Sequence, residues 1–154
     1  MNVEHSILNK NQIEDLESLL ICLIPKVGLM PSATEVDVIG FLQKLMFEQP
    51  SFKNHIFVIL EEIKNICSSQ EKSFDKILCQ EQISIIKQVE IQLPDSFQEL
   101  LKQTYNAYYT NTTVLKLIDG QEHPPQPIGH DLTEGDFSLL DAVKARGDIW
   151  RDIV

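Results

Sequence analysis

Basic residues are scarce in this chain. Its 154 residues include 13 Lys and Arg against 23 Asp and Glu, so the formal net charge is −10 and the isoelectric point is about 4.7. Nucleic acids and anionic membranes are both bound through clustered Lys and Arg, so the composition argues against either as a partner. A basic or mixed-charge protein surface stays compatible with the charge, although solubility alone is the simpler explanation.

Long apolar runs are also missing. A helix needs about 20 apolar residues to cross a bilayer, and the longest run here extends only from Leu19 to Pro25. The amino terminus has neither a basic region followed by an apolar one nor a twin arginine, which are features of export signals. We therefore expect a cytoplasmic protein without direct membrane insertion, which becomes periplasmic or membrane-associated only if a partner carries it.

Cysteine is infrequent and forms no CxxC pair. The chain has three cysteines, Cys22, Cys67 and Cys79. Because three is an odd number, they cannot all pair in disulfides within the chain, which fits a reducing compartment. Cys22 and Cys67 fall within apolar helical patterns, where a thiol usually acts as a small hydrophobic side chain. We expect both to fill the core.

Catalytic and ligand-binding motifs are absent. The six glycines are scattered, with no GxGxxG and no Gly-Lys-Ser or Gly-Lys-Thr, and neither HExxH nor Gly-x-Ser-x-Gly occurs. The nearest approach to a metal site is His123 and His130 with Asp131, but no third soft ligand follows at a regular spacing. We expect no catalytic residue, no metal site and no cofactor in this chain.

Helical periodicity is clear in the first half. A first helix ends at Pro25, and Asn11 with Glu14 is predicted to cap its start. A second helix is predicted to begin at the Ser-x-x-Glu box Ser32–Glu35, and a third to carry Pro50 in its first turn. The predicted buried stripe of the third helix is Phe52, Ile56, Ile59, Leu60, Ile63 and Cys67.

The second half is less uniform. Apolar residues between Ile83 and Ile91 fit a strand or a helix, but the good helix formers from Gln80 to Gln88 favour a helix. Another helix is predicted to restart at Pro94, with an apolar stripe of Phe97, Leu100, Leu101, Tyr105 and Tyr108. Short helices are predicted at Thr113–Ile118 and Phe137–Arg146, the latter with Gly147 as its C-cap.

These segments predict an all-α fold of five to seven helices in one compact, bundle-like domain over residues 1–154. Residues 1–10 are expected to be flexible. Residues 121–131 lack periodicity, and their prolines favour an extended loop that joins neither helix nor sheet.

Aromatic and loop residues near the carboxyl terminus are the candidate contacts with a protein partner. Tyrosine and tryptophan are favoured at interfaces because they offer a large contact area for little lost entropy. Trp150 fits two interpretations, packing under the preceding helix or inserting into another subunit. The candidate partner-binding residues are Tyr109, His123, Pro124, Pro125, Pro127, His130, Trp150 and Arg151.

Two parts of the sequence resemble the gluconate 2-dehydrogenase subunit 3 family. The amino-terminal part has Leu-Ile-Pro ending at Pro25, a short loop, Pro-Ser-Ala-x-Glu from Pro31 to Glu35, and Val-x-x-Phe-Leu from Val38. The carboxyl-terminal part matches in a further set of residues, which comprises Tyr108, Tyr109, Val114, Leu115, the Pro-Pro-Gln-Pro of Pro124–Pro127, Gly129, Arg146, Gly147, Trp150 and Arg151. No twin-arginine signal precedes them, although many members of the family carry one.

The resemblance implies a small accessory subunit without a cofactor of its own. Members of that family bind, and assist the folding, assembly or export of, a flavoprotein large subunit of the glucose–methanol–choline type. That large subunit would hold FAD and oxidise a sugar or polyol, and a cytochrome c subunit is a further expected partner. The resemblance therefore implies a non-catalytic chain within an oxidoreductase complex.

Two alternatives stay open. The first is a stand-alone helical adaptor or regulatory domain for an unrelated protein partner. The second is a small enzyme that uses His123, His130 or Cys79, although no nucleophile–base pair is visible around them.

Overall fold

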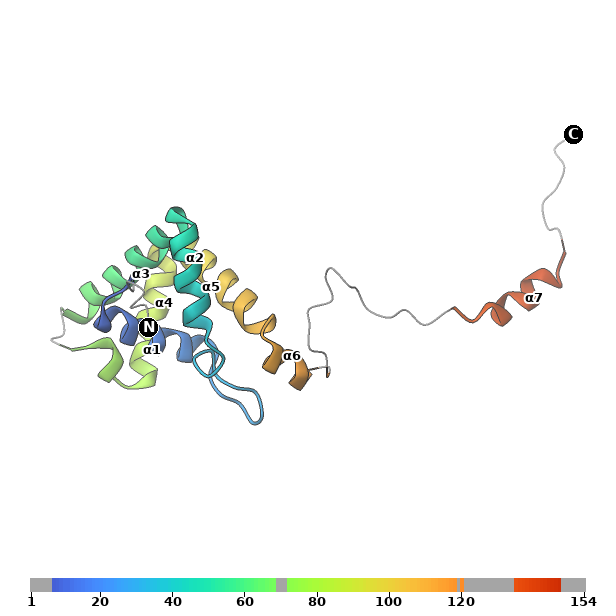
Figure 1. Ribbon diagram of the computed structural model, residues 1–154, viewed down its shortest axis with the longest axis horizontal. Coiled ribbons are helices and arrows are strands. Elements are labelled where there is room, and N and C mark those ends of the chain that lie inside the picture. The colour runs from blue at the N-terminus through green and yellow to red at the C-terminus, as the bar shows by residue number, and fades with distance from the viewer. Residues whose placement is uncertain (1–6, 69–71, 119, 121–134, 148–154) are drawn as a thin grey trace, which may run out of the picture. The chain divides into compact units, whose positions relative to one another are not determined.

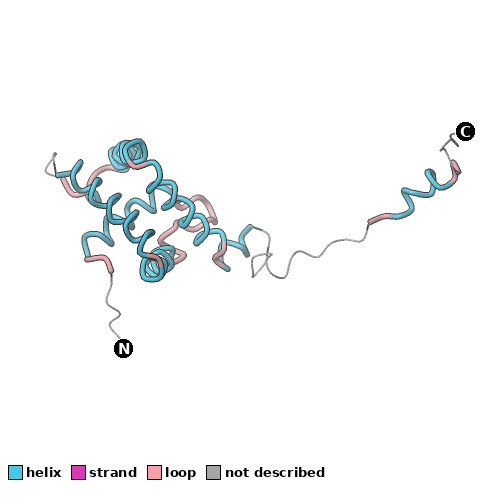
Figure 2. Tube along the Cα trace, turned by 90° about the horizontal axis from the view of Figure 1, so that it is seen from above, coloured by secondary structure: helices cyan, strands magenta, loops and turns pink. Residues whose placement is uncertain are grey.

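The computed structural model describes residues 7–68, 72–118, 120 and 135–147. Within these residues the chain forms seven α-helices and two short 3-10 helices and has no β-strand (Figure 2), which confirms the predicted all-α fold. None of the described helices is long and apolar enough to cross a membrane. Two units, Met1–Pro124 and Pro125–Val154, are distinguished and are described separately, and the expectation of one domain over residues 1–154 stays a prediction.

Helix α3 packs against four other α-helices and one 3-10 helix of the first unit, whose α-helices are labelled in Figure 1. The predicted stripe from Phe52 to Cys67 is confirmed, since each of its six side chains is buried. The elements of this unit are α1 (Lys10–Leu23), α2 (Val38–Glu48), α3 (Pro50–Ser68), the 3-10 helix η1 (Phe74–Lys76), α4 (Cys79–Gln92), α5 (Pro94–Tyr109) and α6 (Thr112–Ile118).

The ambiguous segment around Ile85 is helical, as predicted, and forms α4. Its buried residues Ile85, Ile86 and Val89 lie on one face, next to the polar Gln82, which is also buried. Gln82 tolerates burial because its Nε2 donates a 2.8 Å hydrogen bond to the carbonyl oxygen of Phe74.

The predicted cap of α1 at Asn11 is wrong, because Asn9 occupies that position. The Asn9 side chain accepts a 3.0 Å hydrogen bond from the Gln12 backbone, and the Gln12 side chain accepts one of 3.0 Å from the Asn9 backbone. The observed pair, Asn9 with Gln12, and the predicted pair, Asn11 with Glu14, both have the three-residue spacing of a capping box. Leu8, which directly precedes the Asn9 cap, is 2% exposed, and a buried apolar residue at this position is typical of a helix start.

The start of α2 also differs from the prediction. Ser32–Glu35 forms a turn instead of a helix start, and the cap is Asp37, whose side chain accepts a 3.1 Å hydrogen bond from the Gly40 backbone. Asp37 has a φ of 54°, which is unusual for a residue other than glycine. A Cβ atom at Gly40 would lie 2.5 Å from a carboxylate oxygen of Asp37, so glycine leaves room for this cap.

Helix α5 is rotated relative to the predicted stripe. Tyr105 was expected to face the core, but it is 43% exposed, and the adjacent Thr104 is fully buried. The buried residues of α5 are Phe97, Leu100, Thr104, Ala107 and Tyr108. The buried face of α5 therefore includes Thr104 in place of the predicted Tyr105. A pattern of apolar residues does not indicate this, because threonine is not counted as apolar.

In the second unit, the described residues form one short helical segment. A 3-10 turn, η2 (Phe137–Leu140), leads directly into α7 (Asp141–Lys144). The predicted helix is confirmed from Phe137 to Lys144, with a 3-10 first turn, but it ends before Arg146. Its C-cap is Ala145 instead of the predicted Gly147, although Gly147 has a positive φ of 68°. No described residue of η2 or α7 is buried.

The buried hydroxyl of Thr104 generates a stability prediction. Its Oγ1 has no hydrogen-bond partner among the described residues, and an unsatisfied buried hydroxyl costs about 1–3 kcal/mol. Thr104→Val replaces it with a methyl group of similar size, so we expect the free energy of unfolding to rise by about 1 kcal/mol in urea denaturation. Thr104→Ser is the matched control, and it should lower stability because it keeps the hydroxyl and loses the methyl group. A loss of stability in Thr104→Val would contradict this interpretation.

Candidate functional site: the loop between the first two helices

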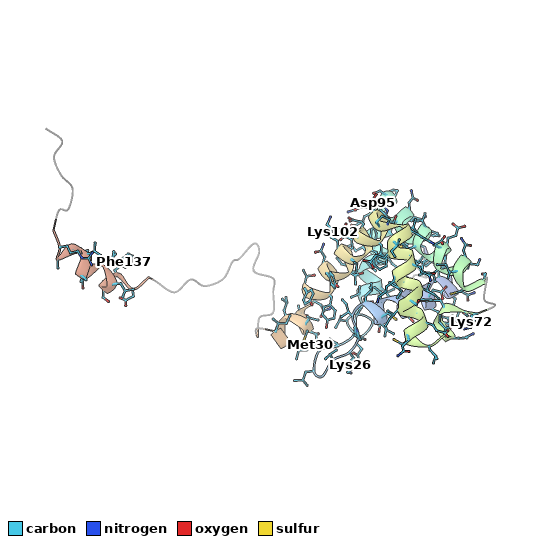
Figure 3. The ribbon with its side chains drawn as sticks, turned by 180° about the vertical axis from the view of Figure 1, so that it is seen from behind. Lys26, Met30, Lys72, Asp95, Lys102 and Phe137 are labelled. Carbon is cyan, nitrogen blue, oxygen red and sulfur yellow. The ribbon has the colours of Figure 1, made fainter. Side chains whose placement is uncertain are left out.

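A tight hairpin projects from the first unit between α1 and α2. Val27 and Met30 pair in an antiparallel bridge, with backbone hydrogen bonds of 3.1 Å and 3.0 Å in the two directions. Gly28 allows the turn because its φ is 59°, where most side chains are strained. Figure 1 shows this segment as a blue loop beyond the helix ends, and Figure 3 labels Lys26 and Met30 on it.

The tip of the hairpin is apolar and open to solvent. Leu29 is 87% exposed and Val27 is 66% exposed. Single exposed apolar residues are common on protein surfaces, but these two lie together on a turn whose backbone is hydrogen-bonded. We name residues 25–31 the Pro25–Pro31 loop.

Glu35 fixes the carboxyl-terminal side of this loop. Its carboxylate accepts a 2.7 Å hydrogen bond from Lys26 Nζ and a 2.8 Å hydrogen bond from the Ser32 backbone N–H. The hydrogen bond from Lys26, followed by the one from Ser32, holds the pKa of Glu35 below its ordinary value. Both members of the ion pair are substantially exposed, so its main effect is to join the two sides of the loop rather than to add stability.

Tyr108 connects the loop to the core. Its ring is 2% exposed, and its hydroxyl donates a 2.7 Å hydrogen bond to the carbonyl oxygen of Pro31. Burial, followed by the nearby Tyr109 and Glu35, raises the pKa of Tyr108, so the phenol stays a donor. Asn111 adds a second tie, because its side chain donates a 3.1 Å hydrogen bond to the carbonyl oxygen of Val36.

Two exposed aromatic rings continue from the ring of Tyr108 along α5. Tyr109 contacts Tyr108 edge to face at 5.1 Å between ring centroids, and Tyr105 lies 6.1 Å from Tyr109. Tyr109 is 51% exposed, in keeping with the expectation that it points away from the core. We call Tyr105, Tyr108 and Tyr109 the tyrosine cluster.

The other sequence-predicted contacts lie outside the described residues. These are His123, Pro124, Pro125, Pro127, His130, Trp150 and Arg151, and the predicted extended loop at residues 121–131 lies there too. Their role as partner contacts stays a prediction.

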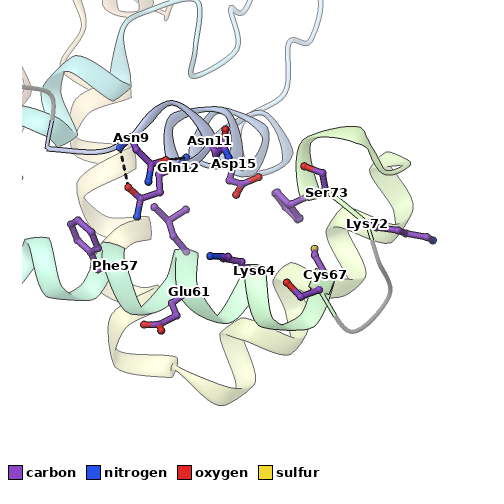
Figure 4. A pocket seen from close by; sticks show the side chains of 13 residues that line it. Asn9, Asn11, Gln12, Asp15, Phe57, Glu61, Lys64, Cys67, Lys72 and Ser73 are labelled. Carbon is purple, nitrogen blue, oxygen red and sulfur yellow. Dashed lines mark hydrogen bonds between the residues drawn. The ribbon is translucent and has the colours of Figure 1, made fainter.

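A polar cavity of about 450 Å³ lies elsewhere on the first unit, between α1, α3 and η1 (Figure 4). Asp15 from α1 and Lys64 and Cys67 from α3 line it. Burial, followed by the charges of Asp75 and Glu14, raises the pKa of Asp15, and burial followed by the charge of Asp15 raises the pKa of Cys67. A thiol with a raised pKa is a poor nucleophile at neutral pH, so the cavity does not activate Cys67.

Among the residues that the structure describes, no group of three or more His, Cys, Asp or Glu could hold a metal ion. The expectation that the chain carries no metal and no cofactor stays a prediction. No protein-family model, no curated protein and no solved structure matches the chain.

The exposed apolar tip was not among the residues proposed from the sequence. A signal for it exists, because Val27 and Leu29 flank a glycine in a segment bounded by Pro25 and Pro31. Apolar residues in so short a turn cannot all be buried. The hydrogen bond that anchors the loop has no such signal in the sequence. Tyr108 and Pro31 are 77 residues apart, and local patterns do not pair them.

The tie between Tyr108 and Pro31 can be tested by removing one oxygen atom. Tyr108→Phe keeps the buried ring and leaves the Pro31 carbonyl without its donor, so we expect the free energy of unfolding to fall by about 1 kcal/mol. Amide hydrogen exchange in residues 26–33 should become faster at the same time. Tyr109→Phe is the matched control on an exposed ring and should change neither quantity. Equal effects of the two substitutions would show that the Tyr108 hydroxyl does not anchor the loop.

The lowered pKa of Glu35 predicts a response of the loop to acid. A carboxylate whose pKa is lower in the folded state stabilises the fold above its unfolded pKa, and this contribution is lost as pH falls through the folded value. We therefore expect the Ser32 amide signal in NMR spectra to shift, and its exchange to accelerate, only below the ordinary Glu pKa of 4.5. Glu35→Gln should remove this transition. A transition that persists in Glu35→Gln would assign it to another group.

Proposed function

We propose that the chain is a non-catalytic accessory subunit that binds an FAD-dependent dehydrogenase of the glucose–methanol–choline type and assists its folding or assembly. The observation that carries this proposal is the pre-organised apolar tip of the Pro25–Pro31 loop. The identity of the partner rests on the sequence resemblance to the gluconate 2-dehydrogenase subunit 3 family.

The location of the resembling residues supports the proposal. Leu23, Ile24 and Pro25 lead into the loop, and Pro31–Glu35 leads out of it, with Ala33 N–H bonded to the Ile24 carbonyl at 3.1 Å. Tyr108, another resembling residue, donates its hydrogen bond to Pro31. Residues from the amino-terminal and carboxyl-terminal parts of the resemblance thus form hydrogen bonds that hold the same exposed turn.

Energetics also favour a binding role for this turn. Binding costs free energy when flexible groups must be ordered, and a loop that is already fixed avoids part of this cost. Full burial of one leucine side chain contributes about 1.5–3 kcal/mol. Leu29 is nearly fully exposed and can supply most of that amount to a complex.

The helical segment of the second unit offers a further apolar surface. Phe137 and Leu139 are 72% and 75% exposed, and Leu140 and Val143 are also exposed. A short helix without a buried residue is marginal in water, since most helical stability in proteins comes from packing. A protein partner would supply that packing. The acidic net charge suits a partner with a basic or mixed-charge surface.

Affinity purification tests the proposal directly. The tagged chain is expressed in the cells that naturally produce it, and the eluate is measured for flavin absorbance and for dye reduction with sugars and polyols. We expect a flavin-containing dehydrogenase to co-purify. Leu29→Asp places a charge at the apolar tip, and loss of about 2 kcal/mol should weaken binding roughly 30-fold.

Leu78→Asp is the matched control for this experiment. Leu78 is 75% exposed, and it precedes α4 at the N-cap position, where aspartate is well tolerated. It should leave co-purification unchanged. A flavin-free partner would favour a stand-alone adaptor, and dye reduction by the isolated chain would show that it is itself an enzyme. Equal losses in both variants would remove the Pro25–Pro31 loop from the binding surface.

A further inference from the structure

Two of the three cysteines lie on the packed pair of helices α1 and α4, one at the end of α1 and one at the start of α4. Cys22 lies in the last turn of α1, and Cys79 is the first residue of α4, a helix that packs against α1. The thiol of Cys22 donates a hydrogen bond to Gln82 Oε1 at 3.4 Å. Gln82 follows Cys79 by three residues, so both side chains lie on the same face of α4. The thiol of Cys22 is therefore held beside the first turn of α4.

The position of Gln82 is itself fixed. It is 8% exposed, and its Nε2 donates to the carbonyl oxygen of Phe74 at 2.8 Å. The side-chain amide therefore presents its oxygen to Cys22 and its nitrogen to η1. Cys22 is only partly exposed, whereas Cys79 is exposed.

The electrostatics of Cys22 agree with this placement. Burial, followed by the charge of the nearby Cys79, raises the pKa of Cys22 to about 11. Both thiols are free in this structure.

We propose that Cys22 and Cys79 form a peroxide-sensitive dithiol site, which closes to an intramolecular disulfide between α1 and α4. The oxidant is hydrogen peroxide or another hydroperoxide. In the first step the Cys79 sulfur attacks one peroxide oxygen, the O–O bond breaks, and Cys79 sulfenic acid and water form. In the second step the Cys22 sulfur attacks the Cys79 sulfur, the S–O bond breaks, and the hydroxyl leaves as water with the Cys22 proton. Two thiols and one peroxide thus give one disulfide and two waters.

Exposure and acidity determine which cysteine reacts first. A dissolved peroxide reaches Cys79 directly, because this residue is exposed. Cys22 is protonated at neutral pH, and a protonated thiol reacts slowly with peroxide. In the second step the proximity of Cys22 to Cys79 offsets the slow reaction of a protonated thiol, because both sulfur atoms belong to one molecule. Cys79 is accordingly the sulfur that is oxidised first, and Cys22 is the resolving thiol.

The disulfide would stabilise the fold by constraining the unfolded chain. It would close the long loop between residues 22 and 79, for which the chain-entropy account gives a large effect. The corresponding rise in Tm is on the order of 10 °C for a chain of this size. It would also pin the end of α1, which continues directly into the Pro25–Pro31 loop.

Peptide mapping of the full chain tests the site without any partner, so the result is independent of flavoprotein binding. The reduced protein is treated with hydrogen peroxide at low protein concentration, remaining thiols are alkylated, and the digest is analysed by mass spectrometry. We expect a linked Cys22–Cys79 peptide pair that is two hydrogen atoms lighter than the free peptides. The Tm should rise by the amount given above and return after treatment with a thiol reductant.

Three variants provide the controls. Cys67→Ser should still form the link, because Cys67 takes no part in it. Cys79→Ser should leave Cys22 reduced, and Cys22→Ser should convert Cys79 into sulfinic acid or into a disulfide between two chains. The proposal is overturned if Cys79 in the unmodified chain reaches sulfinic acid while Cys22 is still alkylated. A link between two chains, or a cross-link that lowers the Tm, would also overturn it.

Discussion

The hydrogen bond from the Tyr108 hydroxyl to the Pro31 carbonyl is the interaction on which the candidate surface depends. It has one end in the core and the other at the base of the exposed hairpin, so it ties the Pro25–Pro31 loop to α5. Glu35 extends this order by holding Lys26 and the Ser32 backbone with one carboxylate. Without these anchors an apolar tip such as Leu29 would have to be ordered when a partner binds, at a cost in affinity.

The helices could be predicted from the sequence because their buried faces repeat apolar residues at helical spacing. Periodic apolar residues such as Phe52, Ile56 and Ile63 determine the buried face of α3, because side chains three and four apart share one face of a helix. The all-α fold followed from this periodicity, whereas the helical state of α4 followed from its good helix formers, because its apolar pattern fits a strand as well as a helix. Helix starts were less predictable, since both Asn9 and Asn11 have a suitable partner three residues on, and the structure uses Asn9.

The candidate site itself was only partly predictable. The Ser32–Glu35 pair was recognised, but its hydrogen bond closes a turn, because Asp37 adopts a positive φ and caps α2 two residues later. Contacts such as Tyr108 with Pro31 and Cys22 with Gln82 join residues that are distant in sequence, and a single sequence carries no signal for such pairs. Tyr109 was proposed as a contact because of its residue type, and the structure adds its exposure and its ring neighbours.

We infer that the Pro25–Pro31 loop is ordered before any partner binds. Backbone ¹⁵N relaxation on the isolated full chain measures this order on the picosecond to nanosecond timescale. We expect order parameters for Val27 to Glu35 close to those of α3 and α5, about 0.85. Values below about 0.6 in this segment, with rigid helices on either side, would contradict it.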